Sequence, residues 1–355
     1  MVLDSFVVEL TSGESYGKIV DRRIDMNVSE RQDREMPSWD TEAAIKQIAG
    51  GGRYACADVM RRVYRSNLEI FRAWGYRTQG GKEVVFGARA AFLDKTRVCD
   101  RPFEYAAKSQ DGGTLWTECV NADCVDVASA LVGEGLNPAI LNLASRFHAC
   151  GGYDKGAGAQ EESICRASTL SLSLYQYFDP RLRCVQEAGV RAKGNAYPLD
   201  IEFGGIYSGD VTFFRHNAKL GFELRDEPFT CGVITVPALN FRENSRYDNS
   251  DLKYRAADGG FTARGQEIQL NKIRTIFRLA LANGHDSLVL GAFGCGVFQL
   301  PPEAVALQFN TVIDEKEFED KFRTIVFAIL EGPETDNHPT GRNGKFAPFY
   351  YIFGD

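Results

Sequence analysis

One stretch of the chain, residues 140–170, restricts the possible folds more than any other. It begins as the apolar segment ILNL, continues as the glycine-rich segment CGGYDKGAG at residues 150–158, and reaches Gln160-Glu161-Glu162 where an apolar-periodic segment begins. Glycine lets a backbone approach a ligand closely, and the first N–H groups of a helix favour an anion. The stretch therefore predicts a strand, a loop and a helix N-terminus that together bind a phosphate-bearing ligand.

The two adjacent carboxylates need a separate explanation, because a phosphate site does not require them. One explanation is structural: acids in a first helical turn complement the helix dipole, and Glu162 could pair with Arg166 four residues on. The other is chemical: consecutive helical residues point about 100° apart, so Glu161 and Glu162 can serve different atoms of one ligand. The nearby glycine segment favours the chemical explanation.

A second segment, LVLGAFGCGVF at residues 288–298, repeats the order of apolar run, glycines and helix. It is either a tight turn between strand and helix or a phosphate contact through backbone N–H groups, and we favour the phosphate contact. It does not match the dinucleotide-binding fingerprint. Cys295 stands between two glycines, but no histidine lies near it in sequence, so we do not expect a nucleophile there.

Together, the two segments resemble those of the microbial-type poly(ADP-ribose) glycohydrolases, enzymes of the macrodomain superfamily. That family carries a Gly-Gly-Gly loop followed after a short gap by Gln-Glu-Glu, and here seven residues separate Gly152 from Gln160. The segment 288–298 resembles the family's pyrophosphate loop, and a weaker similarity extends over residues 61–349. One position departs from the pattern, because Cys150 stands where the family has its first glycine.

The resemblance implies roles for individual residues. Glu162 would be the general acid/base, Glu161 would bind ribose hydroxyls, and Gln160 would support the turn. Asn142 and Phe298 resemble the asparagine and the aromatic residue that face the terminal ribose, although a strand-end hydrogen bond and core packing would also explain them. The implied ligand-binding residues are Asn142, Gly151, Gly152, Gln160, Gly294, Cys295, Gly296, Val297 and Phe298.

Cys150 allows two hypotheses. A glycine adopts positive φ freely, whereas a cysteine there must change the loop path or accept strain on the order of 1–3 kcal/mol. The loop could shift slightly and leave the pocket unaffected. Alternatively, the cysteine side chain could narrow the loop around the terminal ribose, which would favour chain ends or single ADP-ribose groups over internal sites.

Composition limits the class of protein. Hydrophobic residues make up 44% and charged residues 25% of the 355 residues, which is ordinary for a globular chain. A net charge of −7 argues against a broad electrostatic grip on nucleic acid. The nine cysteines lack the dense spacing of a disulfide scaffold, the N-terminus lacks a signal-peptide pattern, and the apolar runs are too short to span a bilayer. We expect a soluble cytoplasmic or nuclear protein.

No metal site or cofactor is expected. Cys119 and Cys124 are too far apart for a typical zinc knuckle, and no second pair follows. His148 is the only histidine close to the glycine loop, and we interpret it as a loop histidine rather than a ligand contact. The three glycines at 50–52 lack the Gly-Lys-Ser/Thr that completes a P-loop.

The pattern along the chain predicts an N-terminal extension at 1–40, a helical accessory region at 41–110 and a catalytic domain at 111–355. The extension holds a possible strand at 6–10 and a charge-rich segment at 21–35, as either a mobile arm or one packed on the domain. Thr41 and Asp58 are candidate helix caps. The other expected strands are a pair at 82–93, strands at 112–120, 140–143, 231–236, 286–293 and 324–330, and antiparallel strands beside the main sheet at 190–230. The other expected helices lie at 125–132, 159–177 and 266–283, and one begins at Pro301. A surface loop is expected at 243–263.

Alternating strands and helices in the second half indicate an α/β fold with a largely parallel core. With the resemblance, this predicts a macrodomain-like three-layer α/β/α sandwich with a mixed central sheet. The implied activity is release of ADP-ribose from poly(ADP-ribose) on modified proteins, by a monomer that binds neither nucleic acid nor membrane. The alternatives are a hydrolase of single ADP-ribosyl groups or free ADP-ribose derivatives, and a non-catalytic ADP-ribose-binding module.

Overall fold

The computed structural model describes residues 35–50, 53–103, 105, 113–243, 249–331 and 344–354, without the side chains of 53 and 54. The chain divides into two compact units, Met1–Glu35 and Met36–Asp355, and the second contains almost all the described residues. The expected strand at 6–10 lies outside the described part, as does the charge-rich segment except for Glu35. The accessory-region boundary near residue 110 stays a prediction.

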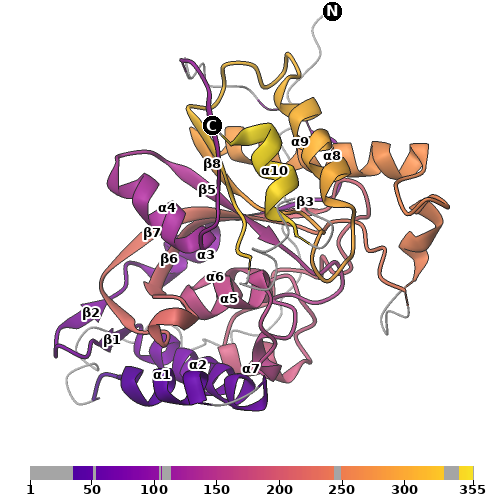
Figure 1. The fold of residues 1–355 in the computed structure, drawn as a ribbon. Coiled ribbons are helices and arrows are strands. Elements are labelled where there is room, and N and C mark those ends of the chain that lie inside the picture. Colours follow the sequence, from indigo (N-terminus) through magenta and orange to yellow (C-terminus); the bar gives the residue numbers. More distant parts are fainter. Residues whose placement is uncertain are drawn as a thin grey trace, which may run out of the picture. The chain divides into compact units, whose positions relative to one another are not determined.

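A seven-stranded mixed sheet forms the centre of the second unit (Figure 1). Five neighbouring strands run parallel, and the strands of the other end pair antiparallel. The spatial order is β3 (Thr96–Cys99), β6 (Gly205–Arg215), β7 (Leu224–Val236), β5 (Pro138–Leu143), β8 (Ser287–Leu290), β9 (Thr324–Ala328) and β4 (Trp116–Val120).

Helices cover both faces of this sheet. One face carries α4 (Cys124–Gly133), α5 (Gln160–Ala167) and α6 (Leu170–Tyr175), and the other carries α8 (Ala263–Ala282), α9 (Pro302–Ile313) and α10 (Phe346–Phe353), as Figure 1 shows. The remaining described elements are α1 (Thr41–Gly50), α2 (Arg53–Ala73), α3 (Arg89–Asp94), α7 (Arg183–Ala188), the hairpin β1 (Gly75–Arg77) and β2 (Glu83–Val85), and the 3₁₀ turns η2 (Tyr153–Lys155), η3 (Ala218–Leu220) and η4 (Ser250–Tyr254).

Alternation along the strands creates two hydrophobic cores. In β5, Ile140 packs into one core with Val125 of α4, whereas Leu141 packs into the other with Phe277 of α8 and Phe309 of α9. Successive strand residues point to opposite faces, so a strand that is apolar at every position can be covered on both sides. The predicted three-layer α/β/α sandwich with a mixed sheet is therefore confirmed.

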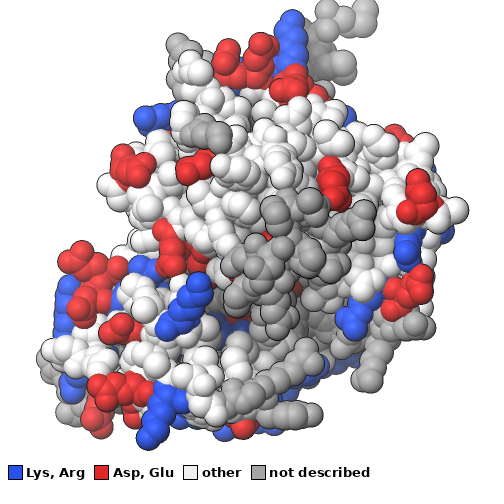
Figure 2. Space-filling view, in the orientation of Figure 1, with Lys and Arg blue, Asp and Glu red and all other residues white. Residues whose placement is uncertain are grey.

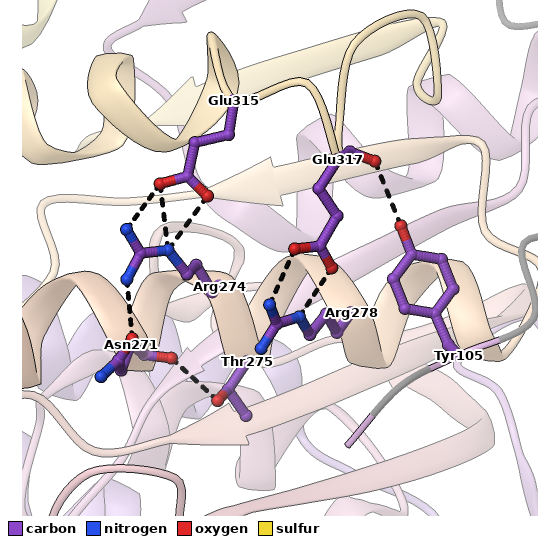
Figure 3. A network of polar contacts seen from close by, with 7 residues as sticks. All are labelled: Tyr105, Asn271, Arg274, Thr275, Arg278, Glu315 and Glu317. Atoms are coloured by element: carbon purple, nitrogen blue, oxygen red, sulfur yellow. Dashed lines mark hydrogen bonds and ion pairs between the residues drawn. The ribbon is translucent and has the colours of Figure 1, made fainter. Parts of the chain in front are cut away.

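A polar network holds the second helical layer together (Figure 3). Arg274 and Arg278, one turn apart on α8, make two-pronged ion pairs with Glu315 and Glu317, which follow α9. The Tyr105 hydroxyl donates to the Glu317 carbonyl at 3.3 Å. Bidentate arginine pairs add geometric specificity as well as energy. They fix α9 against α8 on the face opposite α5.

Several expected elements differ from the structure near the first helices. Only Glu83–Val85 of the expected strand pair at 82–93 is a strand. Residues Arg89–Asp94 form α3 instead, because they include good helix formers and the helix buries Phe92. Asp58 lies inside α2 rather than at its start. Thr41 is the first residue of α1, and the carboxylate of Asp40 accepts the Ala43 N–H in its place.

The prediction of a single helix at 159–177 is wrong, because the helix ends before Ser168 and a second one begins at Leu170. Ser168 is extended and forms a β-bridge with Phe213 of β6, while its hydroxyl donates to the Ile164 carbonyl at 2.7 Å. A serine that bonds nearby backbone offers an alternative to helix continuation. The antiparallel pair expected beside the sheet is β6 and β7, which belong to the sheet itself.

The later elements follow the prediction more closely. The helix at 266–283 is α8, the helix from Pro301 is α9, and the strand at 231–236 is the end of β7. The expected strand at 286–293 ends at Leu290, and the expected loop at 243–263 contains η4. Among the described residues, no helix is long and apolar enough to cross a membrane. Figure 2 shows acidic and basic side chains interspersed on one face.

Candidate functional site

The two glycine segments follow neighbouring parallel strands. β5 ends at Leu143 and β8 at Leu290, and these strands pair in parallel, so both loops leave the same edge of the sheet. Ligands of open α/β sheets bind in the crevice outside the carboxyl ends of the strands. The candidate site is therefore the edge where residues 144–162 and 291–298 meet the sheet.

The first loop needs a left-handed backbone at two successive residues. Cys150 has φ 63° and Gly151 has φ 52°. A Cβ added to Gly151 would lie 2.4 Å from the Oε1 atom of Glu162, and one added to Gly152 would lie 2.8 Å from the Cβ atom of Ala157. Gly151 is thus required by the close approach of the loop to the helix that carries the glutamates, and Gly152 by the close packing of the loop against its own residue Ala157.

Glu161 is buried and held from three directions. Its Oε2 atom accepts the Ser145 N–H at 2.8 Å, and its Oε1 atom accepts the Cys150 N–H at 3.1 Å and an Asn142 side-chain N–H at 3.4 Å. Burial raises the pKa of the Glu161 carboxyl to about 8, opposed by the Ser145 N–H and reinforced by the neighbouring Glu162. The carboxyl therefore has one fixed orientation at the sheet edge.

Glu162 is held at only one of its two oxygens. Its Oε1 atom accepts the Gly152 N–H at 2.8 Å, whereas its buried Oε2 atom has no hydrogen-bond partner among the described residues. The ion pair between Glu162 and Arg166 that the sequence allowed is not formed among the described residues. The Arg166 Nη2 atom donates instead to the Tyr153 carbonyl at 3.3 Å. The Glu162 Oε2 atom is the one oxygen of the two glutamate carboxyls whose hydrogen-bonding capacity stays unused in the described residues.

Gln160 and Asn142 connect these carboxyls to the sheet. The Gln160 side chain accepts the Leu143 N–H at 2.8 Å and donates to the Leu141 carbonyl at 2.7 Å, which joins the start of α5 to the end of β5. Asn142 is fully buried and donates to the Thr235 hydroxyl at 3.2 Å as well as to Glu161. Its predicted contact with a ribose, like the catalytic and anchoring roles of the two glutamates, stays a prediction.

The second loop is shaped mainly by its own backbone. Gly294 has φ 77°, and a Cβ there would lie 2.5 Å from Leu300. Gly296 has open space around it, and Val297 is 55% exposed. Phe298 packs partly against the core, and its carbonyl accepts the Phe241 N–H at 2.8 Å. The loop can therefore present backbone to a ligand at residues 296–297.

Two cysteines are less reactive than their positions suggest. Burial raises the pKa of the Cys295 thiol, so the nucleophilic thiolate form is disfavoured. Cys150 is fully buried in the first core with Ile164, and its thiol interacts with that of Cys165. The position of the Cys150 side chain in the core argues against the narrowed-pocket hypothesis, which stays open to experiment.

Sequence reasoning missed two contributors to the site. Ser145 supplies an N–H to Glu161, and its hydroxyl accepts the N–H groups of Phe147 and His148, at 3.3 and 3.2 Å. A serine directly after a strand was the available signal, since such residues commonly form local turns. The other is Asn67 of α2, which donates to the hydroxyl of the loop residue Tyr153 at 2.8 Å; it lies 86 positions away in sequence and gave no local signal.

The opposite edge of the sheet holds a cavity of about 320 Å³ lined by Lys95, Arg97, Tyr207 and His285, among others. These groups already have partners: Lys95 pairs with Asp210, Arg97 donates to main-chain carbonyls, and the Tyr207 hydroxyl bonds His285 at 2.9 Å. The cavity therefore does not compete with the glutamate site. No group of His, Cys, Asp and Glu in the described residues could hold a metal ion.

Comparisons with known proteins point to the same region. Residues 65–216 match the family model described as microbial-type PARG, catalytic domain, a range that contains the glycine loop and both glutamates and ends before the second loop. Among proteins with curated descriptions, none matches this chain in sequence.

Solved structures extend the likeness to most of the chain. Poly(ADP-ribose) glycohydrolase from Thermomonospora curvata shares 25% identity with a TM-score of 0.61, over 83% of this chain and 99% of that one. Its structure bound to the inhibitor ADP-HPD gives the same values. The enzyme from Deinococcus radiodurans in complex with ADP-ribose shares 23% identity with a TM-score of 0.54, over 76% and 98%, a likeness of fold. The macrodomain-like fold is confirmed.

Proposed function

We propose that this chain, which carries a microbial-type PARG catalytic domain, hydrolyses the ribose–ribose O-glycosidic bonds of poly(ADP-ribose) and releases ADP-ribose. The observation that carries the proposal is the Glu162 carboxylate, with one oxygen held by the Gly152 N–H and the other buried without a partner among the described residues. A module that only binds ADP-ribose does not need this second, oriented carboxylate. The related enzymes have been solved with ADP-ribose and with ADP-HPD.

The geometry supports a mechanism by general acid/base catalysis. The unpartnered oxygen of Glu162 would protonate the leaving ribose oxygen as the bond breaks through an oxocarbenium-like state. The resulting carboxylate would then activate a water for attack at the anomeric carbon. Glu161, held by the N–H groups of Ser145 and Cys150, would bind the ribose hydroxyls beside it. Both acids lie in the first turn of α5, so one rigid helix sets their separation.

The diphosphate would lie between the two loops. The N–H groups at Gly294, Gly296 and Val297 and the N-terminus of α5 would provide hydrogen-bond donors, whereas the Cys295 N–H already donates to the Ala292 carbonyl. The open surroundings of Gly296 and the exposure of Val297 support this part of the proposal. Asn142 and Phe298 would flank the terminal ribose.

The direct test supplies matched poly- and mono-ADP-ribosylated proteins and measures the products released. We expect free ADP-ribose from the polymer, with the last protein-linked unit left in place. Release from the mono-modified protein alone would assign the chain to the hydrolases of single ADP-ribosyl groups. Tight binding of ADP-ribose with no release from either substrate would make it a binding module.

Ligand-induced stabilisation tests the shape of the site independently of turnover. A ligand that binds only the folded state at 100 times its Kd adds about 2.7 kcal/mol to the free energy of unfolding. We expect ADP-ribose to raise the thermal midpoint clearly more than AMP, which lacks the second phosphate and the terminal ribose. Equal shifts would indicate a site for the adenosine part only and would contradict the proposed diphosphate contacts.

We further propose that the chain acts as a monomer in the cytoplasm or nucleus, on protein-attached ADP-ribose and without binding nucleic acid or membranes. The net charge of −7 supports the proposal that the chain does not bind nucleic acid. The absence of disulfides among the nine described cysteines supports a reducing compartment. Size-exclusion chromatography with light scattering tests the oligomeric state, and a mass of twice 39.4 kDa would contradict it.

A further inference from the structure

One face of α2 lies directly against the glycine loop. The carbonyl oxygen of Ala57 would be 2.5 Å from a Cβ added to Gly156, and the Cε atom of Met60 would be 3.2 Å from one added to Gly158. Arg61 donates to the Lys155 carbonyl at 3.2 Å. The helix positions 57, 60 and 61 share one face, because residues three and four apart are neighbours on a helix.

The same face continues toward the glutamates. The ring of Tyr64 meets the ring of Tyr153 edge-on, with centroids 4.9 Å apart. One turn further, Asn67 is fully buried, and its Nδ2 atom donates to the Tyr153 hydroxyl at 2.8 Å and to the Arg166 carbonyl at 2.9 Å. Both side-chain amide hydrogens of Asn67 are therefore used.

These two acceptors belong to the two segments that form the Glu162 hydrogen bond. Tyr153 directly follows Gly152, whose N–H donates to Glu162, and Arg166 lies one turn after Glu162 on α5. The buried Asn67 side chain thus connects the segment that carries the Gly152 N–H donor with the helix α5 that carries the Glu162 acceptor. Buried hydrogen-bond networks that are fully satisfied specify one arrangement of the groups around them.

We propose that Asn67 is a positioning residue of the glutamate site, which holds Gly152 and α5 at the separation that orients the Glu162 carboxylate. Its catalytic consequence rests on the function proposed above, whereas its structural consequence does not. The helical segment before the sheet is, in this respect, part of the site.

A merely structural role is the competing explanation, because Asn67 also accepts a hydrogen bond from Arg215. The Nε atom of this buried arginine donates to the Asn67 Oδ1 atom at 2.7 Å, and its Nη2 atom donates to the Ser66 hydroxyl at 2.8 Å. Ser66→Ala is therefore a matched control. It disturbs the same arginine from the next position on α2, and the Ser66 hydroxyl contacts neither the glycine loop nor α5 through any hydrogen bond in the described part of the chain.

The first experiment measures amide hydrogen exchange at Gly152 in the ligand-free protein. Asn67→Asp keeps the side-chain shape and the Oδ1 acceptor but removes both donated N–H groups: the Arg166 carbonyl loses its donor, and the Tyr153 hydroxyl can bond the new carboxylate only by reversing its direction. We expect exchange at Gly152 to accelerate by roughly tenfold or more, the size of one lost buried hydrogen bond. Ser66→Ala should leave it within about twofold. Unchanged exchange in Asn67→Asp, or equal acceleration in both variants, overturns the proposal.

The second experiment separates turnover from binding on poly(ADP-ribose). We expect Asn67→Asp to lower kcat by about 10- to 100-fold, since a small misplacement of a catalytic group has effects of this size. The Kd for ADP-ribose should change by less than about threefold, because the second loop is untouched. A loss confined to KM, or an equal loss of kcat in Ser66→Ala, contradicts positioning. If the wild-type protein cleaves nothing while Gly152 exchange still responds, the proposed function fails and the positioning role stands.

Tyr153→Phe keeps the test decisive if Asn67→Asp does not fold. It removes one of the two acceptors of Asn67 with little change in shape and leaves Arg215 alone. We expect the same direction at Gly152 and in kcat, by about three- to tenfold. In the double variant with Asn67→Asp the two losses should not add fully, since both substitutions disrupt the same Asn67–Tyr153 hydrogen bond. If the effects of the two substitutions add fully, or if Tyr153→Phe has no effect, the proposal that Asn67 connects the loop to α5 is contradicted.

Discussion

The two loops at the carboxyl edge of the sheet differ in what determines their shape. Side chains from other segments hold the first loop: Glu161 and Glu162 accept its N–H groups, and Asn67 bonds Tyr153 within it. The second loop relies on its own main chain, where the Cys295 N–H donates to the Ala292 carbonyl at 3.0 Å and the Leu300 N–H to the Gly294 carbonyl at 3.0 Å.

This difference assigns different chemistry to the two loops. The first lies against two buried carboxyls of α5 whose orientation depends on tertiary contacts, as acid/base catalysis requires. The second presents exposed backbone near Gly296 and Val297, which suits an anion that needs N–H donors. Substitutions in the first loop should therefore act on turnover, and those at the exposed part of the second should act weakly or on binding.

Removing the acid tests this comparison most severely. Glu162→Gln keeps the size of the side chain but cannot protonate a leaving group or activate water. We expect kcat to fall by at least ~10²-fold, while ADP-ribose still binds. The measurement is released ADP-ribose under saturating polymer, with Val297→Ala in the second loop as the control, which should retain turnover within about threefold. Retained turnover in Glu162→Gln would remove this residue from the mechanism.

The pH dependence of stability tests whether the Glu161 carboxyl that accepts the N–H groups of the first loop has a raised pKa. Burial raises the pKa of Glu161 from 4.5 to about 8, so its stabilising contribution is complete below about pH 4.5 and is lost as the pH rises through 8. Within that window the free energy of unfolding should fall by up to roughly 1.4 kcal/mol per pH unit, relative to Glu161→Gln. Denaturant unfolding at pH 5, 6, 7 and 8 measures this, and parallel pH profiles of the two proteins would show that Glu161 is ionised throughout.

A pair of glycine substitutions compares the loops directly. Gly151→Ala places a Cβ at positive φ and 2.4 Å from the Glu162 Oε1 atom, whereas Gly296→Ala meets nothing within 4 Å. The left-handed conformation alone costs an L-residue roughly 1–2 kcal/mol. We expect Gly151→Ala to lower kcat by about tenfold, and Gly296→Ala to leave kcat and thermal midpoint nearly unchanged. Equal effects of the two substitutions would contradict the distinction between the loops.

Cys150→Gly should have the smallest effect. It relieves the left-handed strain at φ 63° but removes a side chain that is buried in the first core, and these contributions oppose each other. The net change in the free energy of unfolding should stay within about 1 kcal/mol. Because the sulfur lies in the core, the lengths of the products from long polymers should not change. Increased internal cleavage by Cys150→Gly would restore the narrowed-pocket hypothesis.

Local patterns predicted part of this structure well. Apolar periodicity located α8, and the proline pair at 301–302 located the start of α9. Continuous apolar runs located β5 and the end of β7, because burial of these segments depends mainly on their own residues. The order of strand, glycine loop and acidic first turn located the region where Gly151 and Glu162 meet. Prediction was weaker where partners were distant, as at Ser168, whose pairing with β6 ends α5 early.

The sequence by itself determined the chemical groups of the candidate site and their order: a strand end, glycines that permit a left-handed turn, and two carboxylates in a first helical turn. These follow from short-range sterics and helix geometry, which neighbouring residues control. Only the tertiary structure decided that Cys150 faces the core, that one oxygen of Glu162 stays without a partner in the described residues, and that Asn67 bridges the loop to α5. Such contacts join residues as many as 99 positions apart, and no local rule specifies which buried donor will meet which acceptor.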